Sequence, residues 1–255
     1  MFDLSGRVAI VTGGGTGIGR ATAHVLADHG ADVVVASRKV ENIEKAAAEV
    51  RETGRRALAV PTDVRDVEQC HALVDRTVAE FGRLDILVNN AGGSWSKPFE
   101  EWDLDGWENM LNLNLRSVFV LSQYAAPHMI DIGKGAIVNI SSGAAEMGLP
   151  YVLPYGAAKA GVQNMTRTLA AALTPRGIRV NCIGVGAVKS EGFVRAMERI
   201  GRDPDEVGGR SNAVGRAGLP KEIAYPILFL VSDAASFLSG ETIYVGGGPA
   251  VPDLP

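Results

Sequence analysis

Tyr155 and Lys159 stand four positions apart in the stretch PYGAAKAGV, where a helix is expected to begin near Pro154. Side chains four positions apart on a helix lie on the same face, one turn from each other. A phenol with an ordinary pKa of about 10 is a poor acid or base at neutral pH, whereas a neighbouring cation stabilises the phenolate and lowers that pKa. The pair is therefore suited to proton transfer, although the same spacing also occurs in helices for structural reasons alone.

A serine precedes this pair at a position where ligands bind. Ser142 ends the apolar run GAIVNISS, thirteen positions before Tyr155. The run has the composition of a buried strand, and open α/β sheets bind their ligands at the carboxyl ends of their strands. We therefore expect the hydroxyl of Ser142 and the phenol of Tyr155 to face one site.

A glycine-rich turn follows the first apolar run of the chain. The turn reads TGGGTGIGR from Thr12 to Arg20 and leads directly into a segment of helical period. Gly13, Gly17 and Gly19 allow a close approach to a pyrophosphate, which would lie on the free N–H groups of the following helix. Tight strand-to-helix turns need glycine for structural reasons too, but the position after the first strand favours a dinucleotide site.

The end of the second apolar run bears on which dinucleotide would bind. The run ends in ASRK, with Ser37 and Arg38 and without an acidic residue. An Asp or Glu at this point holds the ribose 2′-hydroxyl of NAD, whereas an arginine accommodates the 2′-phosphate of NADP. The sequence therefore favours NADP(H), with NAD(H) as the alternative and a solvated surface charge as the simpler interpretation of Arg38.

Seven short apolar runs alternate with longer segments of helical period, and these elements must position the residues above. The runs are RVAIVT, ADVVVAS, RALAVPT, LDILVNN, GAIVNIS, GIRVNCI and ETIYVGG. Continuous apolar runs are typical of strands buried on both faces of a parallel sheet. The pattern predicts an α/β fold: a single-domain, Rossmann-type, doubly wound parallel sheet of about seven strands with helices on both faces. The domain is expected to span residues 1–255.

One segment interrupts this alternation. Between about 188 and 220 the chain mixes charged residues, glycines and one short amphipathic piece. A long irregular insertion in a compact domain usually has a function. We interpret 188–220 as a lid over a substrate.

Composition excludes several kinds of partner. Apolar residues make up 46% of the chain and charged residues 21%, and the formal net charge of −4 comes with lysines and arginines spread along the sequence. We expect a globular protein that binds a small molecule, without a nucleic-acid or membrane surface. No apolar run approaches the roughly 18 residues needed to span a bilayer. Cys70, Cys182 and the four histidines form no ligand pattern, and the start of the chain lacks a signal-peptide pattern. These features predict no metal site and a cytoplasmic location.

Taken together, the motifs resemble those of the short-chain dehydrogenase/reductase family over nearly the whole chain. The shared motifs, in order, are TGGGTGIG, NNAG at 89–92, Asn114 in MLNLNLRS, Ser142, and Tyr155 with Lys159. Each motif is weak alone, but the combination is specific. The resemblance implies an enzyme that interconverts a ketone and a secondary alcohol by hydride transfer, with NADP(H) or NAD(H) as cofactor.

The resemblance also implies a role for each of four catalytic residues. Tyr155 would be the acid or base that exchanges a proton with the carbonyl oxygen, and Ser142 would hydrogen-bond the same oxygen. Lys159 would bind the nicotinamide ribose and lower the pKa of Tyr155. Asn114 would hold a water that connects Lys159 to solvent as a proton relay.

The cofactor site implied by the resemblance extends along the carboxyl edge of the sheet. Asp63 and Val64 would contact the adenine, while the NNAG motif would line the cofactor at the fourth strand. For Asp63 a helix N-cap is the structural alternative. The complete set of expected cofactor-binding residues is Gly13, Thr16, Gly17, Ile18, Gly19, Ser37, Arg38, Asp63, Val64, Asn90, Ala91, Gly92, Tyr155, Lys159, Gly186, Val188 and Ser190.

The chain departs from the family pattern near its carboxyl end. Val185 stands where a proline is usual, which makes that turn less rigid, and Ser190 stands where a threonine is usual, which keeps a hydroxyl. Gly246 replaces a usual acid. Family members of this length mostly form homotetramers through two long helices and a final strand, and the resemblance implies the same association here.

The substrate is the least determined part of the site. The chain resembles both 3-oxoacyl carrier-protein reductases and 7α-hydroxysteroid dehydrogenases, and NNAGGSWSKPF is closer to the second group. We expect a steroid or other apolar ketone, with a 3-oxoacyl thioester as the alternative and a non-enzymatic dinucleotide sensor as the third hypothesis. The four catalytic residues argue against the sensor. Among the aromatic residues after NNAG, Trp95 is expected to reach the substrate, and Phe99, Trp102 and Trp107 are expected to pack.

Overall fold

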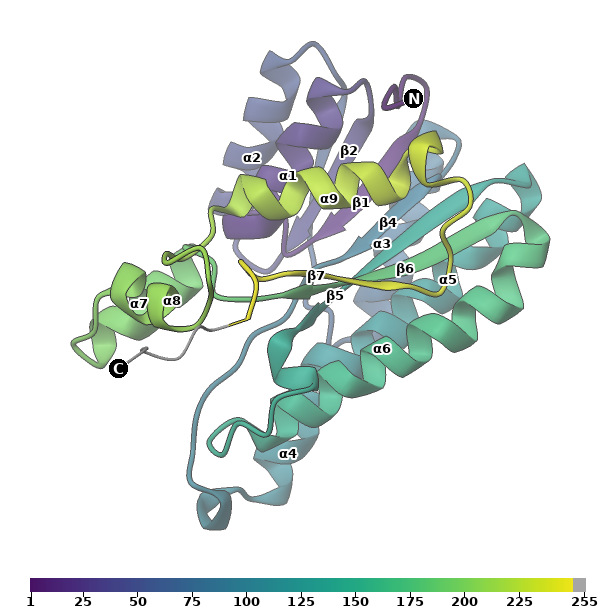
Figure 1. Cartoon of the computed structure of the whole chain (residues 1–255). Helices are drawn as coiled ribbons and strands as arrows, with labels where there is room; N and C mark the ends of the chain where they lie inside the picture. Colours follow the sequence, from purple (N-terminus) through teal and green to yellow (C-terminus); the bar gives the residue numbers. More distant parts are fainter. Residues whose placement is uncertain (250–255) are drawn as a thin grey trace.

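The computed structural model describes residues 1–249, and its centre is one sheet of seven strands (Figure 1). All neighbouring strands pair in parallel, in the order β3-β2-β1-β4-β5-β6-β7. The strands are β1 (Val8–Thr12), β2 (Asp32–Ser37), β3 (Ala57–Pro61), β4 (Ile86–Asn89), β5 (Gly135–Ser142), β6 (Ile178–Val185) and β7 (Thr242–Val245). The order reverses between β1 and β4, where such sheets bind ligands. The predicted doubly wound fold is confirmed; residues 250–255 of the expected domain lie outside the described part.

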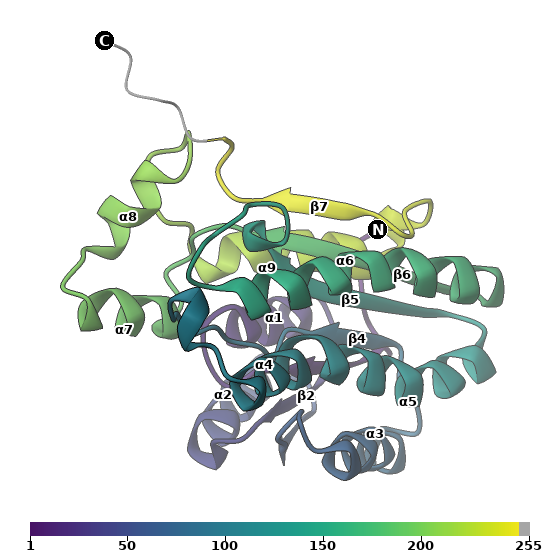
Figure 2. The same ribbon diagram turned by 90° about the horizontal axis from the view of Figure 1, so that it is seen from below.

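Helices cover both faces of this sheet. In the described residues they are α1 (Gly17–Asp28), α2 (Val40–Glu52), α3 (Val67–Phe81), α4 (Leu104–Leu111), α5 (Ser117–Ile132), α6 (Leu153–Leu173), α7 (Glu191–Arg199), α8 (Pro204–Arg210) and α9 (Pro220–Val231). One face carries α1, α2 and α9, and the other carries α3, α5 and α6 (Figures 1 and 2). No helix among these is long and apolar enough to cross a membrane.

Each strand divides its side chains between two hydrophobic cores. Along β1, Ala9 and Val11 belong to the core under α1, α2 and α9, whereas Ile10 belongs to the core under α3, α5 and α6. Successive side chains of a strand point to opposite faces, so a strand covered on both faces is apolar throughout. Complete burial of such a side chain contributes roughly 1.5–3 kcal/mol. The apolar runs therefore predicted the strands correctly.

Local residues set where α3 begins and ends. The side chain of Asp66 accepts the N–H of Glu68 at 2.9 Å, which caps the amino end of the helix. Gly82 ends the helix with a φ of 77°, a left-handed conformation that glycine adopts without strain. The N-cap alternative for Asp63 is therefore wrong, because α3 begins at Val67 and Asp66 supplies the cap.

The segment expected to be an irregular lid contains two helices, α7 and α8, which stand out from the sheet beyond β6 (Figure 1). The hydroxyl of Ser190 caps α7 by accepting the N–H of Phe193 at 3.2 Å. The carboxylate of Asp203 caps α8 by accepting the N–H of Asp205 at 2.8 Å. Short polar caps of this kind stabilise helices that composition alone does not reveal.

Candidate active site

The pair Tyr155 and Lys159 lies in the first two turns of α6, which starts at Leu153 with Pro154 in its first turn. Proline is favoured there because the missing N–H has no partner in a helix start. The ammonium Nζ of Lys159 lies 5.7 Å from the ring centre of Tyr155 and donates to the carbonyl oxygen of Ile140 at 2.8 Å. Only 3% of Lys159 is exposed. The helix therefore presents both groups to the end of β5, as the spacing predicts.

Burial dominates the pKa values of this pair. It lowers the pKa of Lys159 to about 8, because a buried ammonium loses its hydration. It also raises the pKa of Tyr155 above its ordinary value, and a side-chain hydrogen bond with Ser142 opposes that rise. The sequence argument expected a lowered phenol pKa from the ammonium of Lys159 together with a cationic nicotinamide ring. The direction is the opposite here because desolvation of the phenolate outweighs the favourable contacts.

Ser142 reaches the phenol from the last position of β5. Its place at the carboxyl edge is fixed by pairing with Val185 of β6. The oxygen Oγ accepts the N–H of Ala144 at 3.2 Å, which starts the short 3-10 helix after the strand. The same hydroxyl acts on the phenol of Tyr155, where it opposes the rise of the pKa that burial causes. Two such groups can bind one carbonyl oxygen together.

Asn114 lies in a turn of π-helix, η2 (Asn112–Arg116), between α4 and α5. The residue is fully buried. Its Nδ2 donates to the carbonyl oxygens of Gly93 at 2.9 Å and Met110 at 3.1 Å, and its Oδ1 accepts the N–H of Gly93 at 3.1 Å. Such π-turns occur frequently at functional sites. MLNLNLRS carries no sequence signal that separates a π-turn from an ordinary helix.

The position of Gly92 shows that Asn114 and Lys159 face the same space. A Cβ added to Gly92 would lie 2.7 Å from Oδ1 of Asn114 and 3.4 Å from Nζ of Lys159. A side chain at this position would therefore press on both groups. The structure thus brings Asn114, Lys159, Tyr155 and Ser142 to one place at the ends of β4 and β5.

The glycine turn forms a cradle at the amino end of α1. Gly13 and Gly17 have φ values of 64° and 53°, which favour glycine. A Cβ added to Gly19 would lie 2.3 Å from the carbonyl oxygen of Gly13, so the helix approaches the turn too closely for a side chain. Thr16 makes no side-chain cap to this helix, although Thr16 is its N-cap residue. The amino end of α1, with Ile18 in its first turn, is therefore suited to an anion.

Thr12 joins this turn to the NNAG motif, a role that sequence reasoning missed. Its hydroxyl accepts the N–H groups of Asn90 and Ala91, each at 3.0 Å, and donates to the carbonyl oxygen of Val88 at 3.2 Å. In turn, Nδ2 of Asn90 donates a hydrogen bond to the carbonyl oxygen of Thr12 at 2.7 Å. A buried threonine at the end of a strand has no distinctive sequence signal. These bonds fix the distance between β1 and β4, where a cofactor would lie.

Ser190 and Gly186 lie at the far side of this cradle. A Cβ added to Gly17 would lie 2.9 Å from Cβ of Ser190, so the start of α7 packs on the glycine turn. A Cβ added to Gly186 would lie 2.7 Å from Cα of Gly246, which requires glycine at this point. Val188 is buried and bridges to Gly218 at the other end of the lid. Ser190 thus lies against the glycine turn, whereas Gly186 and Val188 lie where β6 meets β7 and the lid.

The end of β2 and β3 carries the residues expected at the adenosine. Oγ of Ser37 faces Gly15 of the glycine turn, where it would lie 3.2 Å from an added Cβ. Arg38 is exposed, and Val64 is buried. The Asp63 carboxylate is bound by a neighbouring arginine, which holds the pKa of Asp63 below its ordinary value. The residues present therefore fit a dinucleotide along the whole edge.

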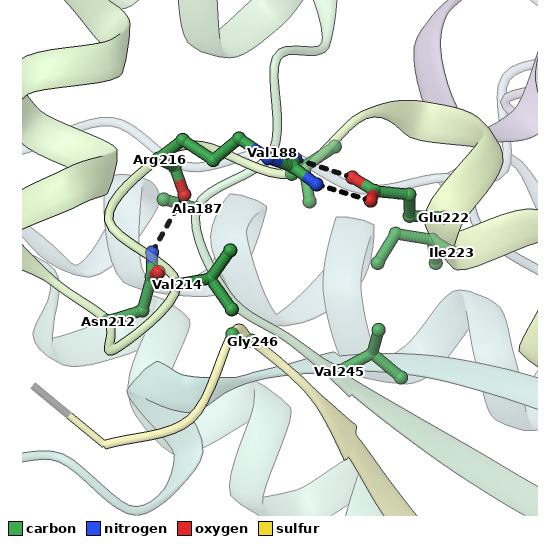
Figure 3. Close-up of a pocket in the computed structure, with 11 residues that line it drawn as sticks. Ala187, Val188, Asn212, Val214, Arg216, Glu222, Ile223, Val245 and Gly246 are labelled. Atoms are coloured by element: carbon green, nitrogen blue, oxygen red, sulfur yellow. Dashed lines mark hydrogen bonds and ion pairs between the residues drawn. The ribbon is translucent and has the colours of Figure 1, made fainter.

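A small cavity lies between the base of the lid and the end of β7 (Figure 3). Its volume is about 120 Å³, and Arg216 and Glu222 close one side of it with an ion pair at 2.6 Å. Nδ2 of Asn212 donates to the carbonyl oxygen of Arg216 at 2.9 Å. Its lining does not include Tyr155 or Ser142. The cavity is therefore separate from the candidate catalytic residues, and the contacts of Arg216 and Asn212 fix the base of the lid around it.

The aromatic residues after NNAG only partly follow expectation. Trp95 and Trp102 pack on each other, with ring centres 6.3 Å apart, and both are half-buried. Phe99 was expected to pack but is 69% exposed, because it lies in a one-turn 3-10 helix at the tip of a long connection. Among the described residues no group of His, Cys, Asp and Glu side chains could hold a metal ion.

Comparison with known proteins identifies several similar chains. A family model of short-chain dehydrogenases matches residues 7–199. Cis-4-hydroxycyclohexanecarboxylate dehydrogenase of Sinomonas cyclohexanicum is 41% identical over 95% of this chain and 96% of its own length. The 3-oxoacyl-[acyl-carrier-protein] reductase of Thermotoga maritima is 35% identical over 96% of this chain and 98% of its own. A 7α-hydroxysteroid dehydrogenase solved with NADH and 7-oxo glycochenodeoxycholic acid superposes with a TM-score of 0.92 at 35% identity, covering 98% of this chain and 96% of that one.

Proposed function

The chain belongs to the short-chain dehydrogenase/reductase family, an NAD(P)(H)-dependent oxidoreductase family acting on alcohols and ketones, and we propose that Tyr155, Ser142, Lys159 and Asn114 form its catalytic site. The observation that carries the proposal is the position of Tyr155 and Lys159 together at the start of α6, with Nζ of Lys159 bound to the end of β5, where Ser142 is the last residue. A phenol and a hydroxyl side by side are suited to hold a carbonyl oxygen and to give it a proton.

The bound nicotinamide supplies or accepts the hydride, and the protein supplies the proton and the position. During reduction, the phenol of Tyr155 gives its proton to the carbonyl oxygen, while Ser142 hydrogen-bonds the same oxygen. Lys159 binds the nicotinamide ribose, and its buried ammonium favours the phenolate that remains. Asn114, whose amide is fixed on Gly93, holds a water that returns a proton from solvent.

The cofactor that this proposal favours is NADP(H). Arg38 follows β2 directly and is exposed, as suits a guanidinium that binds a 2′-phosphate. No acidic residue stands at this strand end to hold a ribose 2′-hydroxyl. NAD(H) is the alternative, and the structurally similar hydroxysteroid dehydrogenase was solved with NADH.

The proposed substrate is an apolar, preferably cyclic, ketone or its secondary alcohol. The connection between Ser142 and Tyr155 exposes several large apolar side chains next to the site, namely Met147, Leu149, Tyr151 and Leu153. Exposed apolar groups in one place are typical of a ligand surface. The relatives that act on a hydroxycyclohexane acid and on a hydroxysteroid support this class. The non-enzymatic sensor finds no support, because the relatives bear the names of dehydrogenases and reductases.

A 3-oxoacyl thioester is the second candidate, supported by the reductase from Thermotoga maritima. An acyl carrier protein is acidic and would need a basic rim. The five acidic residues of 188–220 offset most of the six lysines and arginines of the lid, and among them Lys189 pairs with Asp205 and Arg210 with Glu206. We therefore place this substrate second.

We also propose a substrate lid and a homotetrameric assembly. The helices α7 and α8 would close over the substrate beside Ser190. A groove of about 380 Å³ between α5 and α6, which includes the 48% exposed Phe119, supports association of these helices with another copy in a homotetramer. Cys70 and Cys182 are free thiols, as is usual in a reducing cytoplasm. Light scattering of the purified chain measures the assembly directly: a monomeric mass would contradict the tetramer.

The experiment that tests the function is a substrate panel. The purified chain is assayed with NADPH and with NADH against cyclohexanones, steroid ketones and acetoacetyl thioesters, and the alcohols are assayed in the reverse direction. We expect reduction of a cyclic ketone with NADPH preferred over NADH. Activity confined to thioesters would favour the second candidate. Turnover of no ketone or alcohol in the panel would refute the proposed function.

A further inference from the structure

Arg65 stands at the centre of a cluster of hydrogen bonds beyond the end of β3. Its Nε donates to Oδ1 of Asp63 at 3.0 Å, and its Nη2 donates to Oδ2 at 2.5 Å. The backbone N–H of Arg65 also donates to Oδ1, at 3.1 Å. A guanidinium that holds both oxygens of a carboxylate is the strongest form of ion pair that side chains make. Both side chains are about two-thirds buried or more, with 34% and 25% exposed.

Two further contacts fix the orientation of Arg65. Its Nη1 donates to Oδ1 of Asn109 in α4 at 3.0 Å. Its carbonyl oxygen accepts Nη2 of Arg116, in the π-turn, at 2.6 Å. Asn109 therefore holds the guanidinium on the Asp63 carboxylate, and Arg116 fixes the backbone that carries it.

Arg38 lies beside this pair, on the neighbouring strand. β2 and β3 pair in parallel with Ser37 opposite Pro61, and the N–H of Thr62 donates to the carbonyl oxygen of Ser37 at 3.0 Å. Arg38 and Asp63 thus leave adjacent strands at the same edge, and the charge of Arg38 acts on Asp63. Within residues 1–249, Arg38 makes no ion pair of its own.

We propose that Arg65 is a positioning residue for cofactor choice: by holding the Asp63 carboxylate, it leaves Arg38 free to bind the 2′-phosphate of NADP. This inference rests on the proposed preference for NADP(H). Without Arg65, the carboxylate of Asp63 would lie close to the 2′-phosphate and repel it, and it would compete with the phosphate for Arg38. NADH, which lacks this phosphate, would be much less affected.

The test compares Arg65→Met with a double variant, Asp63→Asn together with Arg65→Met. Dissociation constants of NADPH and NADH are measured by the fluorescence of the bound reduced cofactor. For Arg65→Met we expect NADPH affinity to fall about tenfold more than NADH affinity. Removal of the carboxylate charge in the double variant should restore most of the lost NADPH affinity. Arg65→Lys keeps the charge but not the contact with both carboxylate oxygens. Its NADPH affinity should lie between those of the wild type and Arg65→Met.

Arg56→Met is the matched control, because Arg56 precedes the amino end of β3 and pairs with Glu80 at 2.9 Å. It removes one positive charge next to the opposite end of β3, and we expect no change in the ratio of the NADPH and NADH dissociation constants. Three results would overturn the inference. They are an equal loss of NADPH and NADH affinity in Arg65→Met, no loss of affinity in Arg65→Met, and no recovery of NADPH affinity in the double variant. The proposed preference for NADP is tested separately by the wild type. If the wild-type chain binds NADH more tightly than NADPH, that preference is wrong.

Discussion

Substitution of Gly92 by alanine tests the arrangement of Asn114 and Lys159 most sharply. The added Cβ would lie 2.7 Å from Oδ1 of Asn114, whereas ordinary contact begins at 3.4 Å, so the amide must move by about 0.7 Å. That movement would stretch the bond that Oδ1 accepts from the N–H of Gly93, now 3.1 Å long, beyond the hydrogen-bond range. Asn114 is fully buried, so the loss of this bond leaves a buried amide oxygen without its backbone partner.

Two magnitudes follow for this variant. An unsatisfied buried polar group costs about 1–3 kcal/mol of folding free energy. A displacement of this size in a positioning group lowers turnover by about 10- to 100-fold. The free energy of unfolding is measured by denaturant titration, and turnover is measured by the absorbance of the reduced nicotinamide with a ketone identified by the substrate panel.

The neighbouring glycine provides the matched control. A Cβ added to Gly93 would meet only Cδ2 of Leu113, at 3.9 Å, which is ordinary contact. Gly93→Ala should therefore retain both stability and turnover, since its backbone bonds to Asn114 remain. If Gly92→Ala keeps full turnover, or if the two variants are equally impaired, the described placement of Asn114 and Lys159 is wrong.

Three further predictions concern charge, backbone and thiols. Burial lowers the pKa of Lys159 in the folded protein to about 8, from an ordinary 10.5. The buried ammonium therefore destabilises the folded state fully below pH 8, and this destabilisation fades as the pH rises to 10.5. The unfolding free energy of the wild type should therefore rise across that window by up to about 3 kcal/mol relative to Lys159→Met; parallel pH curves would contradict this. Gly19→Ala places a Cβ 2.3 Å from the Gly13 carbonyl oxygen and should abolish NADPH binding, whereas tight binding in a fluorescence titration would exclude the cradle. Burial raises the pKa of Cys70 to about 11 and also raises that of Cys182, so neither thiol should react with a thiol reagent at about pH 8 before unfolding; rapid labelling of the folded chain would disprove their burial.

The fold could be predicted because burial on both faces leaves a simple pattern. The seven apolar runs became the seven strands, as for Val33, Val34 and Val35 of β2, all fully buried. Helix ends are encoded locally too, since Gly54 and Gly82 follow α2 and α3 and adopt positive φ values. These signals are local, and each reports directly on burial or on backbone conformation.

The missed features depend either on short local caps or on contacts between distant segments. The lid helices α7 and α8 depend on the caps Ser190 and Asp203, which a stretch rich in glycine and charge obscures. The role of Thr12 becomes visible only when β1 and β4 are side by side, and that of Arg65 only when Asn109 and Arg116 reach it. The sequence shows the charge next to Tyr155, but it does not show the burial that raises the pKa of the phenol within the protein itself.

The central claim is that Tyr155 delivers the proton to the substrate carbonyl. Tyr155→Phe removes only the phenol oxygen, and the two quantities to measure are the dissociation constant of NADPH and the turnover of a ketone that the wild type reduces. The account predicts an NADPH affinity within about threefold of the wild type, because the cradle at α1 remains, and a loss of turnover of at least about 100-fold. Retention of turnover with normal NADPH binding would contradict the account.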